Sequence, residues 1–222
     1  PCLERAISLL KIDGRMAMIT PHSLMQSSRF KVLRRHIATV ADAITCSSFS
    51  RIPAGLFDGN VRVRNTILLC RRSSAGSSTV SSSRCRRWYS EFRPHLMALI
   101  RYTDVPSFGD TWPFVDDPRL LQVFDRLRVA CSGSLIQDVV RTDITKGSQT
   151  LFYKGNAYNY LSVAAEPVPI INTDGSPGKT SEQRELPFSS VEARNFAYVL
   201  LAGRIGLAWW AILGDDFHLT KG

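Results

Sequence analysis

The sequence lacks the cysteine and histidine spacings that build metal sites. No two of its five cysteines stand at C-x-x-C spacing, and no histidine lies at ligand spacing from any of them. A structural zinc site is therefore not expected, and neither is any other metal. An odd, scattered set of cysteines is typical of a reduced protein, so we expect a cytoplasmic location. The cysteines are Cys2, Cys46, Cys70, Cys85 and Cys131.

Other catalytic patterns are missing as well. The four histidines have no Ser, Cys or Asp partners arranged as in a catalytic triad. The sequence holds neither G-x-G-x-x-G nor a P-loop, so no phosphate-binding turn for a nucleotide is visible. Asp215 and Asp216 fit a helix-end turn better than a metal-binding pair. The four histidines are therefore interpreted as structural or surface residues.

Acidic residues are outnumbered by basic ones. The 222 residues hold 28 Lys and Arg but 19 Asp and Glu, which gives a net charge of +9, and Arg outnumbers Lys. Arginine forms forked contacts with phosphate and stacks on flat rings, so a nucleic-acid partner is one interpretation. A basic but ordinary enzyme surface is the other, and charge alone leaves both open.

A long hydrophobic run free of charge is also absent. The stretch "FAYVLLAGRIGLAWWAIL" approaches the ~20 residues that a membrane span needs, but Arg204 falls in its middle. The pattern favours one buried helix over 193–213, ending at Gly214. Ser189 and Glu192 have capping-box spacing at its start. We expect no membrane partner; association with a membrane through this helix is the weaker alternative.

Helix and strand patterns alternate in residues 1–72. A helix over 2–11 precedes "RMAMIT", which suits a strand buried on both faces. A second helix follows Ser27 and Ser28, with Arg34 and Arg35 expected on its solvent side. The runs "AITCSSF" and 61–69 then predict two more strands. A helical connection favours a parallel first pair, and a short connection favours an antiparallel last pair. The sequence predicts an α/β fold whose mixed sheet has one reversed strand near its edge.

The composition changes abruptly after residue 72. In "RRSSAGSSTVSSSRCRR", Gly and Ser dominate between two Arg clusters, so we interpret 73–83 as a flexible linker or loop and place the main boundary there. Beyond it, Asp117 and Pro118 open a helix. Aromatic residues alternate with polar ones around Gly155 and Asn156, which predicts a hairpin over 152–160.

Phe57 is a large apolar ring in a segment that otherwise reads as a turn. It lies between Gly55 and Gly59 in "AGLFDGNVRVRN". One interpretation is that the ring packs inward and anchors the loop. The other is that the ring is presented to stack on a nucleobase, with Arg62 and Arg64 beside it for phosphates. Flanking glycines would let the loop approach a base closely.

Several motifs resemble one family. "AISLLKIDGRMAMITPHSLM", followed by "SSRFKVLRRHI", is similar to a pattern of amino-group (N6-adenine) DNA methyltransferases of restriction–modification systems. "LFDGNVRVRNTILLCRR" resembles the family's strand hairpin, in which an aromatic residue stacks on the flipped adenine. "LAGRIGLAWWAILGDDFHLTKG" resembles the end of the family's target-recognition region. The likeness touches both ends of the chain and leaves a diverged middle.

The resemblance implies a fold and a set of roles. Residues 1–72 would be the C-terminal half of a class I S-adenosylmethionine-dependent methyltransferase sheet, with its last strand antiparallel. Residues 84–222 would be an α+β target-recognition region. Phe57 would stack on adenine, and Gly14 and Pro21 would bracket the strand that supports the catalytic loop. The residues expected to contact double-stranded DNA are Arg62, Arg64, Arg84, Arg86, Arg87, Lys154 and Tyr158.

One departure from the family pattern bears on activity. The family's glycine-rich cofactor loop and Asn-Pro-Pro-Tyr-type motif occur nowhere in these residues. We therefore expect S-adenosylmethionine to be bound by a full-length protein and not by this chain alone, and we expect a catalytic half to precede Pro1. The alternative function is a non-catalytic DNA-binding specificity module.

Overall fold

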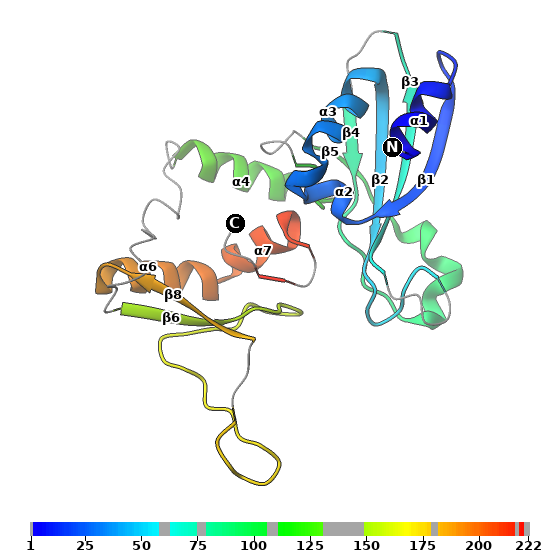
Figure 1. Ribbon diagram of the computed structural model, residues 1–222. Coiled ribbons are helices and arrows are strands. Elements are labelled where there is room, and N and C mark those ends of the chain that lie inside the picture. The colour runs from blue at the N-terminus through cyan, green and yellow to red at the C-terminus, as the bar shows by residue number, and fades with distance from the viewer. Residues whose placement is uncertain are drawn as a thin grey trace. The chain divides into compact units, whose positions relative to one another are not determined.

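The computed structural model describes residues 2–57, 63–74, 79–105, 111–130, 149–178, 182–215 and 218–219. The chain divides into two compact units, Pro1–Asp125 and Arg126–Gly222 (Figure 1). This division lies far beyond the Ser-rich stretch at 73–83, where the sequence analysis placed the main boundary. Residues 84–105 belong to the first unit because they pair with its sheet and cover part of its core.

The first unit is built on a five-stranded mixed sheet. Its strands are β1 (Arg15–Pro21), β2 (Ala41–Phe49), β3 (Asn65–Arg72), β4 (Thr79–Ser82) and β5 (Thr103–Val105), in the spatial order β1-β3-β2-β4-β5. Strand β3 is antiparallel to both β1 and β2, β4 is parallel to β2, and β5 is antiparallel to β4. The predicted mixed α/β class is confirmed. The sheet has two reversed strands, β3 next to one edge and β5 at the other, where the sequence analysis expected one. Strands β1 and β2 run in the same direction but do not pair, because β3 lies between them.

Helices accompany this sheet along the chain. They are α1 (Cys2–Leu9), α2 (Ser23–Gln26), α3 (Lys31–Val40) and α4 (Pro118–Ala130), with the short 3-10 helices η1 (Ser28–Phe30), η2 (Ser90–His95) and η3 (Met97–Leu99). Helices α1 and α3 contact each other, α1 contacts β1, and α3 contacts β2. They bury Ile7 and Ile37. The apolar faces predicted for both helices therefore meet the core.

Arg34 does not lie in solvent as the sequence analysis expected. Its side chain is 2% exposed, and its Nη1 donates hydrogen bonds to the carbonyl oxygens of Leu24 and Ser27, at 2.8 and 2.9 Å. These carbonyls lie in and just after α2, where helical partners run out. A guanidinium carries several donors in a fixed plane, so Arg34 satisfies both carbonyls and ties α3 to α2.

Strand β1 is not buried on both faces, although its apolar sequence predicted this. It is an edge strand that pairs only with β3. Ile19 is 47% exposed, and Leu69 of β3 is 42% exposed. Ile19 lies opposite Ile67, and Ala17 lies opposite Leu69, so these side chains share one face of the sheet. That face presents apolar side chains to the surroundings.

The Ser-rich stretch is not a linker along its whole length. Residues Thr79–Ser82 form β4, which is paired between β2 and β5. Ser82 and Ser83 are fully buried, and the hydroxyl of Ser83 accepts a hydrogen bond from the backbone N–H of Ser48 at 3.1 Å. Because hydroxyls can be buried at little cost once they are hydrogen-bonded, a strand can form here with Val80 as its single apolar residue.

The second unit contains a three-stranded antiparallel sheet. Its strands are β6 (Gln149–Lys154), β7 (Val163–Ala164) and β8 (Gln183–Phe188), in the order β7-β6-β8. The predicted hairpin around Gly155 is confirmed as the β6–β7 pair, with residues 155–162 as its connection. Leu151 and Phe188 form a core with Ala197 of α6 (Val191–Ala202).

The predicted single helix over 193–213 is wrong, because the structure has two helices. Helix α6 ends at Ala202, and α7 (Arg204–Leu213) follows at an angle of 64°. Gly203 between them has extended dihedral angles, φ −83° and ψ 173°. A Cβ built on Gly203 would lie 2.7 Å from the Val199 carbonyl oxygen, so glycine suits this bend. The hydroxyl of Ser190, not Ser189, caps α6 by accepting from the Ala193 N–H.

Within the described residues, no individual helix has the length and apolar character required to cross a bilayer. The bent pair α6 and α7 meets the requirement only when its two helices are counted together, by length and composition.

Candidate nucleic-acid interface

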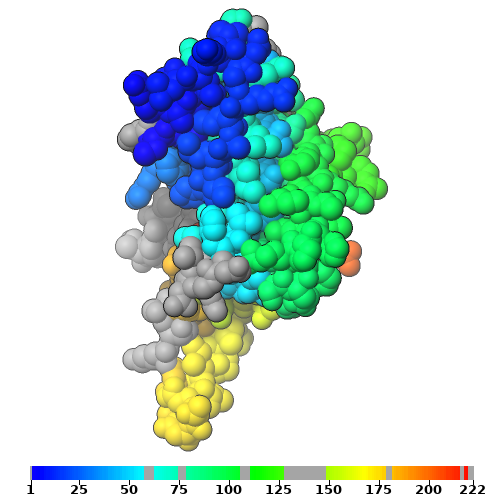
Figure 2. Space-filling view, turned by 90° about the vertical axis from the view of Figure 1, so that its right-hand side faces the viewer, coloured from blue at the N-terminus to red at the C-terminus, as the bar shows by residue number. Residues whose placement is uncertain are grey.

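The Phe57 ring is partly presented to the surroundings. Residues 50–57 leave the carboxyl end of β2, and Phe57 is 43% exposed. Figure 2 shows this segment, in cyan, beside the green surface formed by residues of the 84–105 segment. Gly59 and Arg62, which the sequence analysis placed around the ring, lie outside the described residues. The ring is thus neither fully enclosed nor fully free.

The backbone of this loop is bonded to the 84–93 segment. The N–H of Ser50 donates to the Arg86 carbonyl at 2.8 Å, and the N–H of Ala54 donates to the Trp88 carbonyl at 3.1 Å. Backbone hydrogen bonds therefore join residues 50–54 to residues 86–88 beyond the end of β2. The loop that carries Phe57 is fixed by contacts remote in sequence.

Arg93 makes the contacts closest to Phe57. Its Nη1 donates to the Leu56 carbonyl oxygen at 2.8 Å, and its Nη2 donates to the Gly55 carbonyl oxygen at 3.3 Å. Its guanidinium carbon lies 4.9 Å from the centre of the Trp88 ring, within the range of a cation–π contact. The guanidinium thus holds both carbonyls that precede the ring.

An apolar cluster supports the loop from below. Phe49, Trp88 and Leu96 are buried together, and Leu56 and Ile67 pack against them. Leu56 and Phe57 are adjacent, yet Leu56 contributes to this core while Phe57 remains exposed. Leu56, and not Phe57, therefore packs against the core at this point of the loop.

Polar side chains are buried at the carboxyl ends of β1 and β2. The hydroxyls of Ser48 and Thr66 lie 2.9 Å apart, and Thr20 donates its hydroxyl to the Thr66 carbonyl oxygen at 3.2 Å. His22, just after β1, stacks on Phe114 with ring centroids 4.0 Å apart. Hydrogen bonds among buried hydroxyls of this kind make a strand end rigid.

Arg64 is placed next to this cluster. The backbone N–H of His22 donates to the Arg64 carbonyl oxygen at 3.0 Å, and Pro21 lies opposite Asn65 in the β1–β3 register. The Arg64 side chain is half-buried. Pro21 is the last residue of β1, so Pro21, Phe57 and Arg64 all belong to the end of the sheet at which β1 and β2 finish.

Gly14 lies at the other end of β1. A Cβ there would come within 2.7 Å of the Lys11 carbonyl oxygen, and the preceding Asp13 has a positive φ of 63°. Glycine is therefore required by the tight turn between α1 and β1. Gly14 and Pro21 do bracket β1, with Gly14 just before it and Pro21 at its end.

The cations of the 84–87 segment differ in exposure. The Arg84 side chain is 61% exposed, although its Nε lies 3.3 Å from an oxygen of Asp116. Arg86 is nearly buried; it donates to the Leu99 carbonyl oxygen and lies 3.4 Å from Asp116. Burial lowers the pKa of Arg86, and the positive charge of Arg84 lowers it further. Arg87 is half-buried. Of these three, Arg84 is the most available to a phosphate.

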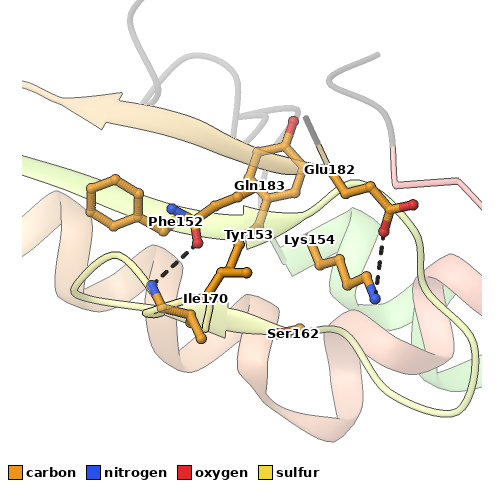
Figure 3. A pocket seen from close by; sticks show the side chains of 8 residues that line it. Phe152, Tyr153, Lys154, Ser162, Ile170, Glu182 and Gln183 are labelled. Carbon is orange, nitrogen blue, oxygen red and sulfur yellow. Dashed lines mark hydrogen bonds and ion pairs between the residues drawn. The ribbon is translucent and has the colours of Figure 1, made fainter. Parts of the chain in front are cut away.

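Lys154 and Tyr158 belong to the second unit, whereas Phe57 belongs to the first. Lys154 lies at the end of β6 with its Nζ 3.5 Å from a Glu182 oxygen (Figure 3). It lines a cavity of about 300 Å³ together with Phe152, Val168 and Ile170. Tyr158 is half-buried in the β6–β7 connection.

Positive charge is concentrated in the first unit. Its 125 residues hold 18 Lys and Arg against 10 Asp and Glu, a net charge of +8. The second unit holds 10 Lys and Arg against 9 Asp and Glu, a net charge of +1. An electrostatic attraction to nucleic acid would therefore act on the first unit.

That this chain alone does not bind S-adenosylmethionine stays a prediction. Strand β1 is followed directly by His22 and α2, and β2 is followed by the loop that Arg93 holds. Neither strand end carries a glycine-rich turn. Across the part of the chain that the structure describes, no group of three or more His, Cys, Asp or Glu side chains could hold a metal ion.

The sequence places Arg93 in an Arg-rich segment, 84–93, that was expected to contact DNA, but it does not show the contacts of Arg93 with the Phe57 loop, nor Trp88 and the two exposed aromatic residues nearby. Tyr89 and Phe92 are 59% and 50% exposed on the segment that holds the Phe57 loop. The sequence shows that this segment is aromatic and basic, but nothing in it indicates that the segment bonds to residues 50–56.

Comparisons with known proteins give little likeness. No protein-family model matches the chain, and no curated protein matches it. Among solved structures, a chain in the one described as "cryoEM structure DrdV-DNA complex" is similar, with a TM-score of 0.43 and 16% sequence identity. The match covers 49% of this chain and 12% of that chain, so this chain spans a small part of the other's length.

Proposed function

We propose that this chain is the C-terminal part of a site-specific DNA adenine N6-methyltransferase. In this role, the first unit binds the DNA backbone and holds Phe57 against an adenine that has left the duplex. The observation that carries the proposal is the half-exposed Phe57 ring on a loop whose backbone is fixed by Arg93, within a unit of net charge +8.

The chemistry of base capture suits this arrangement. An enzyme that modifies a base inside a duplex must extrude it and hold it between flat side chains. Stacking on an aromatic ring contributes ~1–3 kcal/mol per base, and the ring must not collapse into its own core for this to work. Leu56 fills the core in place of Phe57, which leaves the ring available.

The sheet topology also supports the proposal. The resemblance implies a catalytic sheet whose last strand is reversed. Strand β3, antiparallel between β1 and β2, has that direction and is the last strand of residues 1–72, although β4 and β5 follow it in the same sheet. The free edge of β1 and the exposed apolar side chains Ile19 and Leu69 are the surface that a cofactor-binding half would cover.

S-adenosylmethionine would supply the methyl group in the complete enzyme, but the residues of this chain do not fit it. No step of methyl transfer is therefore assigned to them. Their part is to bind DNA through cations such as Arg64 and Arg84 and to stabilise an extruded base through Phe57. The rival function, a DNA-binding module that works with a separate catalytic chain, requires only the first of these two activities.

The proposal predicts a preference for an extruded adenine. The 222-residue chain should bind a duplex with a single bulged adenine more tightly than the same duplex fully paired, because Phe57 stacks on the free base. Substitution Phe57→Ala should lower this preference by about 5- to 150-fold, the equivalent of ~1–3 kcal/mol. Fluorescence anisotropy of end-labelled duplexes measures both affinities.

Phe196→Ala is the matched control, because Phe196 is an exposed phenylalanine of the second unit. It should leave the preference unchanged. A wild-type chain with no affinity for either duplex would refute DNA binding itself. Equal preference in wild type and Phe57→Ala would refute the role of Phe57.

A further inference from the structure

We propose that Arg93 is a positioning residue, which acts on the extruded base only by holding Phe57 in a stacking orientation. The inference rests on the proposed function of Phe57. Arg93 is separated from Phe57 by 36 positions in the sequence, yet it contacts the two residues that precede the ring.

The hydrogen bonds of Arg93 define its part in the loop. The carbonyl oxygens of Gly55 and Leu56 accept from its two terminal nitrogens, Nη2 and Nη1. A planar guanidinium presents these donors in a fixed fork, so it sets the relative orientation of two consecutive peptide groups. The direction in which the chain reaches Phe57 follows from that orientation.

The guanidinium is itself held in place. It lies over the buried ring of Trp88, at 4.9 Å from the ring centre, and Trp88 packs with Phe49 in the core. The Trp88 carbonyl also accepts the N–H of Ala54. A chain of contacts thus runs from the core through Trp88 and Arg93 to the residue before Phe57.

This arrangement explains how a loop with Gly55 can present a ring at low entropic cost. A side chain that must be ordered on binding loses about 0.5–1.5 kcal/mol, and a loop ordered beforehand avoids this loss. Arg93 would therefore raise affinity for an extruded base without touching it. Arg84, which is mostly exposed, represents the other use of a cation, as a direct contact to phosphate.

The dependence of DNA affinity on salt concentration distinguishes a positioning arginine from an arginine that contacts phosphate. A phosphate contact contributes about 0.9 to the slope of log K against log salt concentration. In Arg93→Met, we expect the preference for the bulged duplex to fall by about 2- to 10-fold, the fold-change that corresponds to ordering one side chain. The affinity for the paired duplex and its salt slope should stay at the wild-type values.

Arg101→Met is the matched control, because Arg101 is an exposed arginine of the same unit and the substitution removes the same charge. It should leave the preference unchanged. In the Phe57→Ala background, Arg93→Met should have no further effect on the preference, since it acts through the ring.

Arg93→Lys decides the question if the Met variant fails to fold. A lysine keeps a positive charge near Trp88, but its ammonium group cannot reproduce the forked hydrogen bonds of the guanidinium to two carbonyl oxygens. The preference of Arg93→Lys for the bulged duplex should therefore lie between those of wild type and Phe57→Ala. A wild-type preference in both Arg93 variants would overturn the inference while leaving Phe57 intact. A reduced salt slope in Arg93→Met would overturn it too, because it would make Arg93 a phosphate contact.

Discussion

The two units of this chain differ in charge and in what they bury. The first unit carries a net charge of +8 and buries a cluster of hydroxyls at its strand ends, whereas the second carries +1 and has a purely apolar core around Leu151 and Phe188. Buried polar groups must be paired in one arrangement, so they specify a rigid geometry more strictly than an apolar core does. We therefore expect the first unit to hold its buried side chains in a more strictly defined geometry than the second unit does.

This difference also changes where contacts with DNA are expected. The resemblance put the recognition region at 84–222, but the 84–105 part pairs with the first unit and holds the Phe57 loop. The cations of that segment therefore belong to the same compact unit as the ring. Base capture and backbone binding would be two functions of one unit.

The largest expected effect is the loss of folding stability in one unit when a side chain is removed from its core. Phe49→Ala removes a fully buried ring from the first core and should cost ~3–5 kcal/mol, while Leu151→Ala removes a fully buried side chain from the second and should cost ~2–5 kcal/mol. Hydrogen exchange followed by mass spectrometry should show faster exchange only in the unit that carries the substitution. Faster exchange in both units for either variant would show that they unfold together.

The two longer helices and three strands of residues 2–72 could be predicted, because the helices have an apolar period and the strands have short apolar runs. Ile7 and Ile37 lie on helical faces that the sequence marks, and the direction of the strands follows from the lengths of their connections. Strand β4 could not be predicted in this way. Val80 is its only apolar residue, and its pairing with β2 and β5 and the hydrogen bond of the adjacent Ser83 depend on partners remote in sequence, which composition does not reveal.

The site shows the same limit. Phe57 is conspicuous in the sequence because a bulky ring on a glycine-flanked loop needs a reason. Arg93 and Arg34 look like ordinary surface cations, and only tertiary contacts show that both are occupied by backbone carbonyls. The bend at Gly203 was missed because an apolar run of suitable length suggests one helix, and a close backbone approach cannot be seen in a one-dimensional pattern.

A smaller effect should distinguish the units as DNA-binding surfaces. Arg84→Gln should lower the slope of log K against log salt for a paired duplex by about 0.9, as expected for one lost phosphate contact. Lys154→Gln removes a cation of the second unit that is already 3.5 Å from a Glu182 oxygen. We expect a smaller change in slope for Lys154. An equal or greater loss in Lys154→Gln would extend the DNA surface to the second unit, as the sequence analysis predicted.

The smallest effect concerns pH and compares one carboxylate from each unit. A hydrogen bond from Arg71 lowers the pKa of Asp42 in the first unit, and a hydrogen bond from the Ser176 hydroxyl lowers the pKa of Asp174 in the second. A carboxyl whose folded pKa lies below its unfolded value of about 3.8 stabilises the protein above that pH, and the stabilisation is lost as pH falls through the folded pKa.

Asp42 joins β2 to β3, whereas Asp174 closes a local turn. Asp42→Asn should therefore reduce the acid sensitivity of the urea midpoint of the first unit, and Asp174→Asn should reduce that of the second unit by a smaller amount, because its hydrogen bonds are local. The Asp174 side chain is exposed and the Asp42 side chain is partly exposed, so the shift should be small and should shrink with added salt. An unchanged acid limb in Asp42→Asn would show that the Asp42–Arg71 pair contributes nothing to the stability of the sheet.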